Sequence, residues 1–251
     1  MKLLLTSSGI SNTSIQNALV ELLGKTIAES NALFIPTAIY PFAYGARYAW
    51  HPISGKTQSP FCNLGWKSMG LLELTALPSI DKEVWIQAVQ DADALLVWGG
   101  DPLYLSYWLQ QSGLAELLPS LLLKTVYVGV SAGSMAASSI FGETYGGPRG
   151  GRGEPLTTET ITLSTPSGEI QRPFVKARGA GLVAFALIPH LDHKDHLDAY
   201  DANAAIWASK LPVPVYAIDD QSAIKVDGDI IEVVSEGKWK LFNADNTGMG
   251  V

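Results

Sequence analysis

The chain has 251 residues, 47% hydrophobic and only 16% charged, so it is long and apolar enough to bury the core of an α/β enzyme domain. Its 17 Lys and Arg against 24 Asp and Glu give a net charge of −7, which leaves no basic field to attract nucleic acid. One cysteine cannot form an intrachain disulfide, and no apolar run approaches the ~20 residues of a membrane span or forms a signal peptide, so we expect a cytoplasmic protein that binds neither nucleic acid nor membrane.

Short apolar runs without in-and-out alternation recur in the first half of the chain, as in parallel strands covered on both faces. These runs are KLLLT (2–6), ALFIPT (32–37), LLELTAL (71–77), ALLVWGG (94–100) and TVYVGV (125–130). Segments of helical period lie between them, one after the capping candidate Asn12 and one after Asp81. The pattern predicts an α/β fold with an open, mostly parallel sheet and helices on both faces, in a single domain over residues 1–251.

The second half begins with a glycine-rich segment, GETYGGPRGGRGEPL (142–156), whose six glycines disfavour a fixed helix or strand. It is predicted to be a mobile surface loop. A strand over 184–188, a helix over roughly 197–210 and a strand VPVYAI (213–218) follow. The runs SAIKV (222–226), IIEVV (230–234) and KWKLF (238–242) are predicted to be C-terminal antiparallel hairpin strands at a sheet edge.

A serine flanked by glycines follows the predicted strand TVYVGV. Gly129, Ser131 and Gly133 form the pattern G-x-S-x-G, and small helix-forming residues come next. In a nucleophile elbow the glycines avoid side-chain clashes, and backbone N–H groups such as that of Ala132 point at the group under attack. The pattern predicts Ser131 as a nucleophile, the alternative being a serine that only caps a helix.

A serine nucleophile needs a base, and the sequence has four histidines, His51, His190, His193 and His196. His190 directly follows a predicted strand, at the carboxyl edge where open α/β sheets place their chemistry, so it is the preferred base. His193 and His196 fit a polar loop and helix start. The three nearby histidines, with Asp192 and Asp195, lack the spacing of known zinc motifs, so neither metal nor cofactor is expected.

The base in turn needs a carboxylate to orient it. Asp219 and Asp220 follow the strand VPVYAI, and only one of two adjacent side chains can point inward. We predict Asp220 as the acid, with Asp192 as its rival; an acidic turn without a catalytic role is the remaining alternative.

A second glycine turn follows the predicted strand ALLV. Gly99 and Gly100 precede Asp101, a candidate helix cap, and Pro102, which suits a first helical position. Such a turn lets the backbone approach a substrate closely. Gly99, Gly100 and Ala132 are therefore the predicted oxyanion hole, although a tight turn between strand and helix explains the same glycines.

These stretches resemble the peptidase E and cyanophycinase-like serine peptidases (peptidase family S51), which have a class I glutamine-amidotransferase-like fold. The resemblance covers most of the chain and rests on GVSAGSM, VWGGDPLYL, ALIPHLDH and AIDDQSAIKV. It implies Ser131 as nucleophile, His190 as base and Asp220 at the position of the acid, which is glutamate in peptidase E. The family often has three glycines and an asparagine where this chain has Trp98 to Asp101.

The resemblance also implies a small peptide substrate, either a dipeptide with an N-terminal aspartate or a β-aspartyl-arginine link. Both substrates present a carboxylate, which a guanidinium can bind bidentately. Arg149 and Arg152 in the glycine-rich segment, with Asp101, are the predicted substrate-binding residues. Further cations that the sequence leaves open are Arg47, Arg172, Lys176 and Arg178.

Other functions remain open. A glutamine amidotransferase needs a cysteine at the elbow, but the only cysteine is Cys62. A binding protein could have kept the fold and lost catalysis. An esterase or amidase of the α/β-hydrolase type would take its acid from between serine and histidine, where the glutamates are Glu143, Glu154, Glu159 and Glu169.

Overall fold

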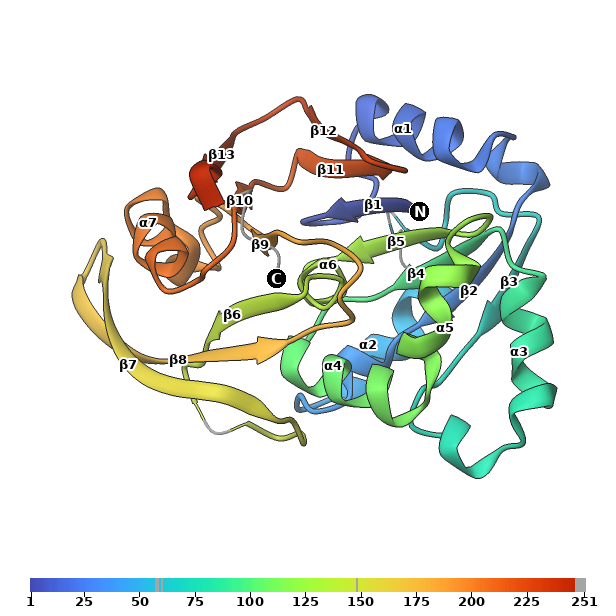
Figure 1. Cartoon of the computed structure of the whole chain (residues 1–251), viewed down its shortest axis with the longest axis horizontal. Helices are drawn as coiled ribbons and strands as arrows, with labels where there is room; N and C mark the ends of the chain where they lie inside the picture. Colours follow the sequence, from blue (N-terminus) through green and yellow to red (C-terminus); the bar gives the residue numbers. More distant parts are fainter. Residues whose placement is uncertain (57–58, 60, 148, 247–251) are drawn as a thin grey trace.

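The computed structural model describes residues 1–56, 59, 61–147 and 149–246, and its centre is an open sheet flanked by helices (Figure 1). Within these residues the main sheet has seven strands in the order β12-β11-β1-β5-β4-β2-β3. Five of them run parallel, and at one edge β11 pairs antiparallel with both β1 and β12. The predicted mostly parallel α/β sheet is therefore confirmed. Its strands are β1 (Lys2–Thr6), β2 (Asn31–Ile35), β3 (Ser68–Leu71), β4 (Ala94–Val97), β5 (Val126–Val130), β11 (Ser222–Asp227) and β12 (Ile230–Ser235).

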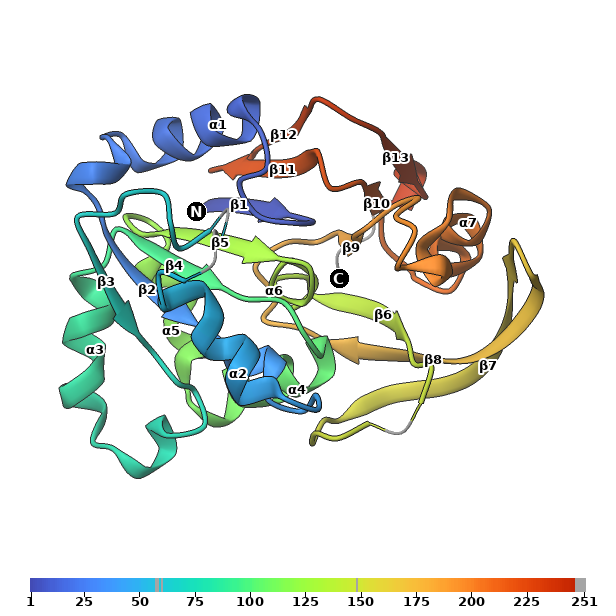
Figure 2. The same ribbon diagram turned by 180° about the vertical axis from the view of Figure 1, so that it is seen from behind.

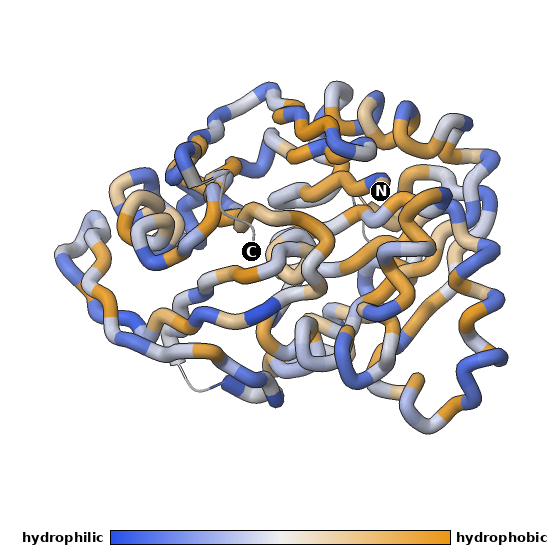
Figure 3. Tube along the Cα trace, in the orientation of Figure 1, coloured by the Kyte–Doolittle hydropathy of each residue, from blue (hydrophilic) through white to orange (hydrophobic). Residues whose placement is uncertain are grey.

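Alternate residues of the central strands enter two apolar layers, one on each face of the sheet. On one face Leu4 and Val128 pack with Ile15 of helix α1. On the other face Leu5 and Tyr127 pack with side chains from helices α3, α4 and α5. Hydrophobic residues accordingly follow the central strands, whereas hydrophilic ones gather on the outer loops (Figure 3). These helices are α1 (Thr13–Leu23), α3 (Lys82–Gln90), α4 (Pro102–Gln111) and α5 (Leu114–Leu121).

The predicted helix starts are confirmed. Asn12 caps α1, since its side chain accepts a hydrogen bond of 2.9 Å from the backbone N–H of Ile15. Asp81 occupies the corresponding position before α3 without a side-chain capping bond. The short helix α2 (Gly45–Trp50) lies near α4 on the side seen from behind (Figure 2). None of the helices in the described part of the chain combines the length and apolar composition of a membrane span.

The prediction of a strand over residues 71–77 was wrong, because β3 ends at Leu71. Leu72, Leu74 and Leu77 are buried, so the apolar run anchors a loop to the core. Glu73 holds this loop by accepting hydrogen bonds from the hydroxyl groups of Thr37 and Thr75. The apolar run at 71–77 is therefore explained by the burial of Leu72, Leu74 and Leu77 in the core and does not indicate a strand.

The prediction of a mobile surface loop over residues 142–156 was wrong at both ends of the segment. The long hairpin that follows the segment was not predicted. Strand β6 (Ile140–Thr144) enters the segment, and β7 (Pro155–Thr165) begins before it ends. With β8 (Gly168–Arg178) they form an antiparallel sheet in the order β6-β8-β7. In β7, Ile161 and Leu163 are buried and alternate with exposed threonines, a period-two pattern that predicts a strand.

A third sheet brings two chain segments toward the end of β5. Strands β9 (Ala186–Ile188) and β10 (Val215–Ile218) run parallel, and β13 (Trp239–Phe242) pairs antiparallel with β10. The hairpin prediction thus holds for β11 and β12 but was wrong for KWKLF, which joins β10 instead. Helix α7 (Asp201–Ser209) confirms the predicted helix after a short 3-10 turn, Leu197–Ala199.

Candidate active site

Ser131 lies in the sharp turn between β5 and the short helix α6 (Ala132–Met135). Its backbone has φ 50° and ψ −112°, a conformation that side-chain-bearing residues rarely adopt and that costs about 1–3 kcal/mol. The turn requires Gly133, because a Cβ there would collide with the backbone of Val97. The strained turn aims the serine away from the sheet, as in a nucleophile elbow.

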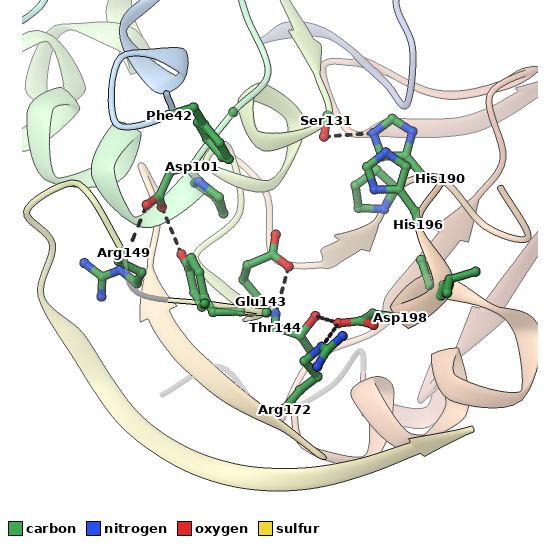
Figure 4. A pocket seen from close by; sticks show the side chains of 18 of the residues that line it. Phe42, Asp101, Ser131, Glu143, Thr144, Arg149, Arg172, His190, His196 and Asp198 are labelled. Atoms are coloured by element: carbon green, nitrogen blue, oxygen red, sulfur yellow. Dashed lines mark hydrogen bonds and ion pairs between the residues drawn. The ribbon is translucent and has the colours of Figure 1, made fainter. Parts of the chain in front are cut away.

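Three of the side chains singled out from the sequence form a hydrogen-bonded chain. Ser131 Oγ lies 3.0 Å from His190 Nε2, and His190 Nδ1 lies 2.8 Å from Asp220 Oδ1. An ionised carboxylate only accepts hydrogen bonds, so Nδ1 carries the proton and Nε2 accepts from the serine hydroxyl. Figure 4 shows Ser131 facing His190 across the upper part of a pocket.

A further residue, Ser7, is hydrogen-bonded to both Asp220 and His190. The sequence analysis did not identify it. Its hydroxyl group donates to Asp220 Oδ1 at 3.0 Å and accepts from the backbone N–H of His190 at 2.6 Å. His190 has φ 60°, so its backbone also needs outside support. Because Ser7 directly follows β1, which pairs with β5, the carboxyl-edge rule that selected His190 could have found it.

Asp220, and not its rival Asp192, contacts His190. Partial burial raises the pKa of Asp220, but the hydrogen bond and charge of His190 and the hydrogen bond from Ser7 outweigh burial and hold this pKa well below its usual range. Asp192 instead accepts a hydrogen bond from the backbone N–H of Asp201. None of the described glutamates between Ser131 and His190 is hydrogen-bonded to the histidine.

The other nearby histidines surround His190. The ring of His196 stacks on that of His190, with centroids 4.0 Å apart and planes 11° from parallel. Burial, and then the neighbouring histidines, lower the pKa of His196 to about 4, so this ring stays neutral. His193 Nε2 lies 3.8 Å from Asp220 Oδ2. In the part of the chain that the structure describes, no group of three or more His, Cys, Asp or Glu residues could hold a metal ion.

Two residues considered for other roles lie elsewhere. His51 starts a short 3-10 helix and accepts a hydrogen bond from Arg47. Cys62 is buried in the core, and burial raises its pKa to about 12, so its thiol is a poor nucleophile.

The turn after β4 borders the serine. An added Cβ at Gly99 would lie 3.3 Å from the Ser131 Cβ, and Gly100, with φ 144°, presses against the backbone of Ala38. The backbone N–H groups of Gly99, Gly100 and Ala132 have no acceptor among the described residues. Donors left unpaired beside a serine hydroxyl suit an oxyanion that forms there.

Ser131 and His190 open into a pocket of about 510 Å³ (Figure 4). Asp101 lines it and caps α4, accepting hydrogen bonds from the backbone N–H of Leu103 and Tyr104 and from the Tyr145 hydroxyl group. Charged groups on its walls come from the turn before α4, from β6, β8 and the glycine-rich segment, and from the loop after β9. Its charged lining residues other than the histidines are Asp101, Glu143, Arg149, Arg172, Asp195 and Asp198.

The two pocket arginines are held differently. Arg172 Nε donates to Asp198 Oδ2 at 3.1 Å. Arg149 Nε lies 3.9 Å from Asp101 Oδ2, too far for a hydrogen bond, and this buried atom has no hydrogen-bond partner among the described residues. Arg152 is exposed and does not line the pocket. Arg149 therefore keeps an unpaired N–H group in the pocket wall, and Arg152 does not line the pocket.

Comparisons with known proteins identify a family and similar folds. The family model described as peptidase family S51 matches residues 3–148, more than half of the chain. The fold is similar to that of a candidate peptidase E from Listeria monocytogenes EGD-e, with 14% identity, TM-score 0.58, and 94% of this chain and 98% of that chain covered. It is also similar to a peptidase from an acI-B1 Actinobacterium, with 20% identity, TM-score 0.59, and coverage of 95% and 88%. No curated protein matches the chain.

Proposed function

The chain belongs to peptidase family S51, and on that premise we propose that it is a serine peptidase that cleaves small peptides through Ser131, His190 and Asp220. The observation that carries the proposal is the continuous hydrogen-bonded chain from the serine hydroxyl through the imidazole to the carboxylate, at the mouth of a pocket. The strained backbone at Ser131 and the unpaired backbone N–H groups beside this serine also support the proposed peptidase activity.

The reaction follows from the proton positions. His190 Nε2 takes the Ser131 proton as Oγ attacks the peptide carbonyl carbon, and Asp220 stabilises the imidazolium that forms. The backbone N–H groups of Gly100 and Ala132, with Gly99 beside them, stabilise the oxyanion. The C–N bond then breaks as the imidazolium protonates the leaving amine, and water hydrolyses the acyl-enzyme with His190 again as base.

A fluorophosphonate probe tests the proposal. We expect it to add one phosphonyl group to Ser131, because the neutral imidazole activates this hydroxyl and the donors stabilise the phosphonyl oxygen. Intact-mass and peptide mass spectrometry measure the label. The Ser131→Ala variant should carry none. A folded protein that stays unlabelled would favour a binding protein of the same fold.

We further propose that the substrates are dipeptides or short peptides with an acidic first residue, whose side-chain carboxylate is bound by Arg149. The Nε–H of this half-buried side chain has no hydrogen-bond partner among the described residues, which supports the assignment, since a carboxylate ligand would satisfy it. Asp101 fixes the wall beside it through the cap of α4 and the Tyr145 hydroxyl group.

Arg149→Gln tests this specificity. The protein is expected to prefer Asp over Asn at the first residue by at least tenfold in kcat/KM, about 1.4 kcal/mol, and the variant to lose most of that preference. The measurement is kcat/KM on paired aryl-amides of Asp and Asn. Arg152→Gln is the matched control, because Arg152 is exposed outside the pocket, and it should keep the preference. Discrimination below tenfold in the unmodified protein would reject acidic specificity while leaving the serine mechanism intact.

A further inference from the structure

Glu143 is a pocket carboxyl group that the mechanism above does not use. It lies on β6, and it lines the same pocket as Ser131 and His190. Its Oε1 atom accepts a hydrogen bond of 2.8 Å from the backbone N–H of Thr144. The second oxygen is directed into the pocket, toward the side where Ser131 and His190 lie (Figure 4).

The neighbouring acids have partners that Glu143 lacks. Asp198 is paired with Arg172 and accepts a hydrogen bond of 2.8 Å from the Thr144 hydroxyl group. Asp101 receives two backbone N–H groups and the Tyr145 hydroxyl group, with Arg149 close by. Within the described residues no cation is paired with Glu143. The pocket therefore holds more carboxyl groups than its two arginines neutralise, and Glu143 is one that neither arginine pairs with.

Burial makes a negative charge on Glu143 costly when no cation is bound beside it. Burial raises the pKa of Glu143 to about 8; the hydrogen bond from Thr144 opposes the increase, and the charges of Asp101 and Asp198 add to it. A buried carboxylate becomes stable when a cation pairs with it. A primary ammonium group suits this place, because it is compact and brings several N–H donors to a carboxylate that has one oxygen free.

We propose that Glu143 binds the free α-ammonium group of the substrate's first residue. The inference rests on the proposed peptidase function. In this arrangement Glu143 binds the ammonium group, Arg149 binds the acidic side chain, and the scissile carbonyl group lies at Ser131. The pocket is then specific for peptides whose amino end is free. Glu143 is then a specificity-determining residue for cleavage after the first residue.

The experiment compares substrates that differ at the amino group. Aspartyl p-nitroanilide, its N-acetyl derivative and succinyl p-nitroanilide, which lacks only the ammonium group, are assayed with the unmodified protein and Glu143→Gln. We expect kcat/KM for the free amine to exceed that for the succinyl compound by at least 30-fold, and Glu143→Gln to reduce this ratio below about threefold. Glu154→Gln is the matched control, since Glu154 is exposed in the neighbouring glycine-rich segment, and it should keep the full ratio. A ratio unchanged in Glu143→Gln overturns the proposal.

A second variant and a further substrate test the proposal independently of Glu143→Gln. If Glu143→Gln does not fold, Glu143→Asp keeps the charge on a shorter side chain and should give an intermediate ratio; an unchanged ratio there counts against Glu143. An N-acetyl-lysyl p-nitroanilide tests whether a side-chain ammonium group is the true ligand, and cleavage as fast as that of the free aspartyl compound overturns the α-amino assignment.

Failure of the inference and failure of the peptidase proposal give different results. Calorimetric binding of aspartate against succinate reports amino-group recognition without any chemistry, and fluorophosphonate labelling reports the serine alone. Labelling without preference for aspartate rejects only the role of Glu143. Preference for aspartate without labelling rejects the peptidase and leaves an amino-group-binding site.

Discussion

Ser131→Ala is expected to lower kcat by at least about 10⁴-fold, because it removes the atom that forms the acyl-enzyme. The fold should persist, since among the described residues the Ser131 side chain is hydrogen-bonded to His190 alone and the turn is held by backbone contacts to Thr6 and α6. Alanine tolerates the positive φ of this turn no better than serine, so the free energy of unfolding should change by less than ~1 kcal/mol. The measurement is kcat on the best peptide substrate, with thermal unfolding in parallel.

Ser138→Ala is the matched control for this loss. Ser138 lies shortly after α6, and its buried hydroxyl group has no hydrogen-bond partner among the described residues. Removing it should leave kcat within about twofold. Turnover by Ser131→Ala close to that of the unmodified protein would end the serine-peptidase proposal.

Asp220→Asn is expected to lower kcat by about 10³- to 10⁴-fold. The amide can donate to His190 Nδ1, which moves the imidazole proton to Nε2, so the base can no longer accept the Ser131 proton. The variant keeps the size of the side chain and its place beside Ser7. The measurement is kcat/KM against pH, together with the rate of fluorophosphonate labelling.

Asp192→Asn separates the two acids that the sequence left open. Asp192 contacts the Asp201 backbone and lies 3.7 Å from the Lys238 ammonium group, so this variant should keep kcat within a few-fold. The opposite outcome, a large loss in Asp192→Asn and a small one in Asp220→Asn, would transfer the role of the acid to Asp192.

Local patterns explain why much of the fold and site could be predicted. Buried parallel strands read as continuous apolar runs, and the residues that follow such a run lie at the carboxyl edge of a sheet. Ser131, His190 and Asp220 each follow such a run, so the structure brings together residues chosen one at a time. The error at 71–77 has the same origin, because a buried loop and a buried strand both need apolar side chains.

The rest depends on contacts between distant segments. Its place after β1 marks Ser7 as a carboxyl-edge residue, but Ser7 meets His190 and Asp220 only after the ends of β1 and β10 have come together, and the sequence TSSGI does not name those partners. The stacking of His196 on His190 follows from the path of one loop after β9. Glu143 is placed in the pocket by strand β6 of the antiparallel sheet. The sequence analysis did not predict this strand, because it assigned the glycine-rich segment to a loop.

The position of Ser7 bears on when the proposed active site is completed during synthesis. Strand β1 pairs with β11, so Leu3 lies opposite Val226, and Ser7 bonds to Asp220 just before β11. A ribosome that has released only the first two hundred residues has therefore delivered Ser131 and His190 but neither the acid nor the strand that holds it. The nucleophile elbow can fold early, because β1, β4 and β5 all precede it, while the hydrogen bonds that set the imidazole form last. A nascent chain of that length thus carries Ser131 and His190 without the hydrogen bonds from Asp220 and Ser7 that orient the imidazole.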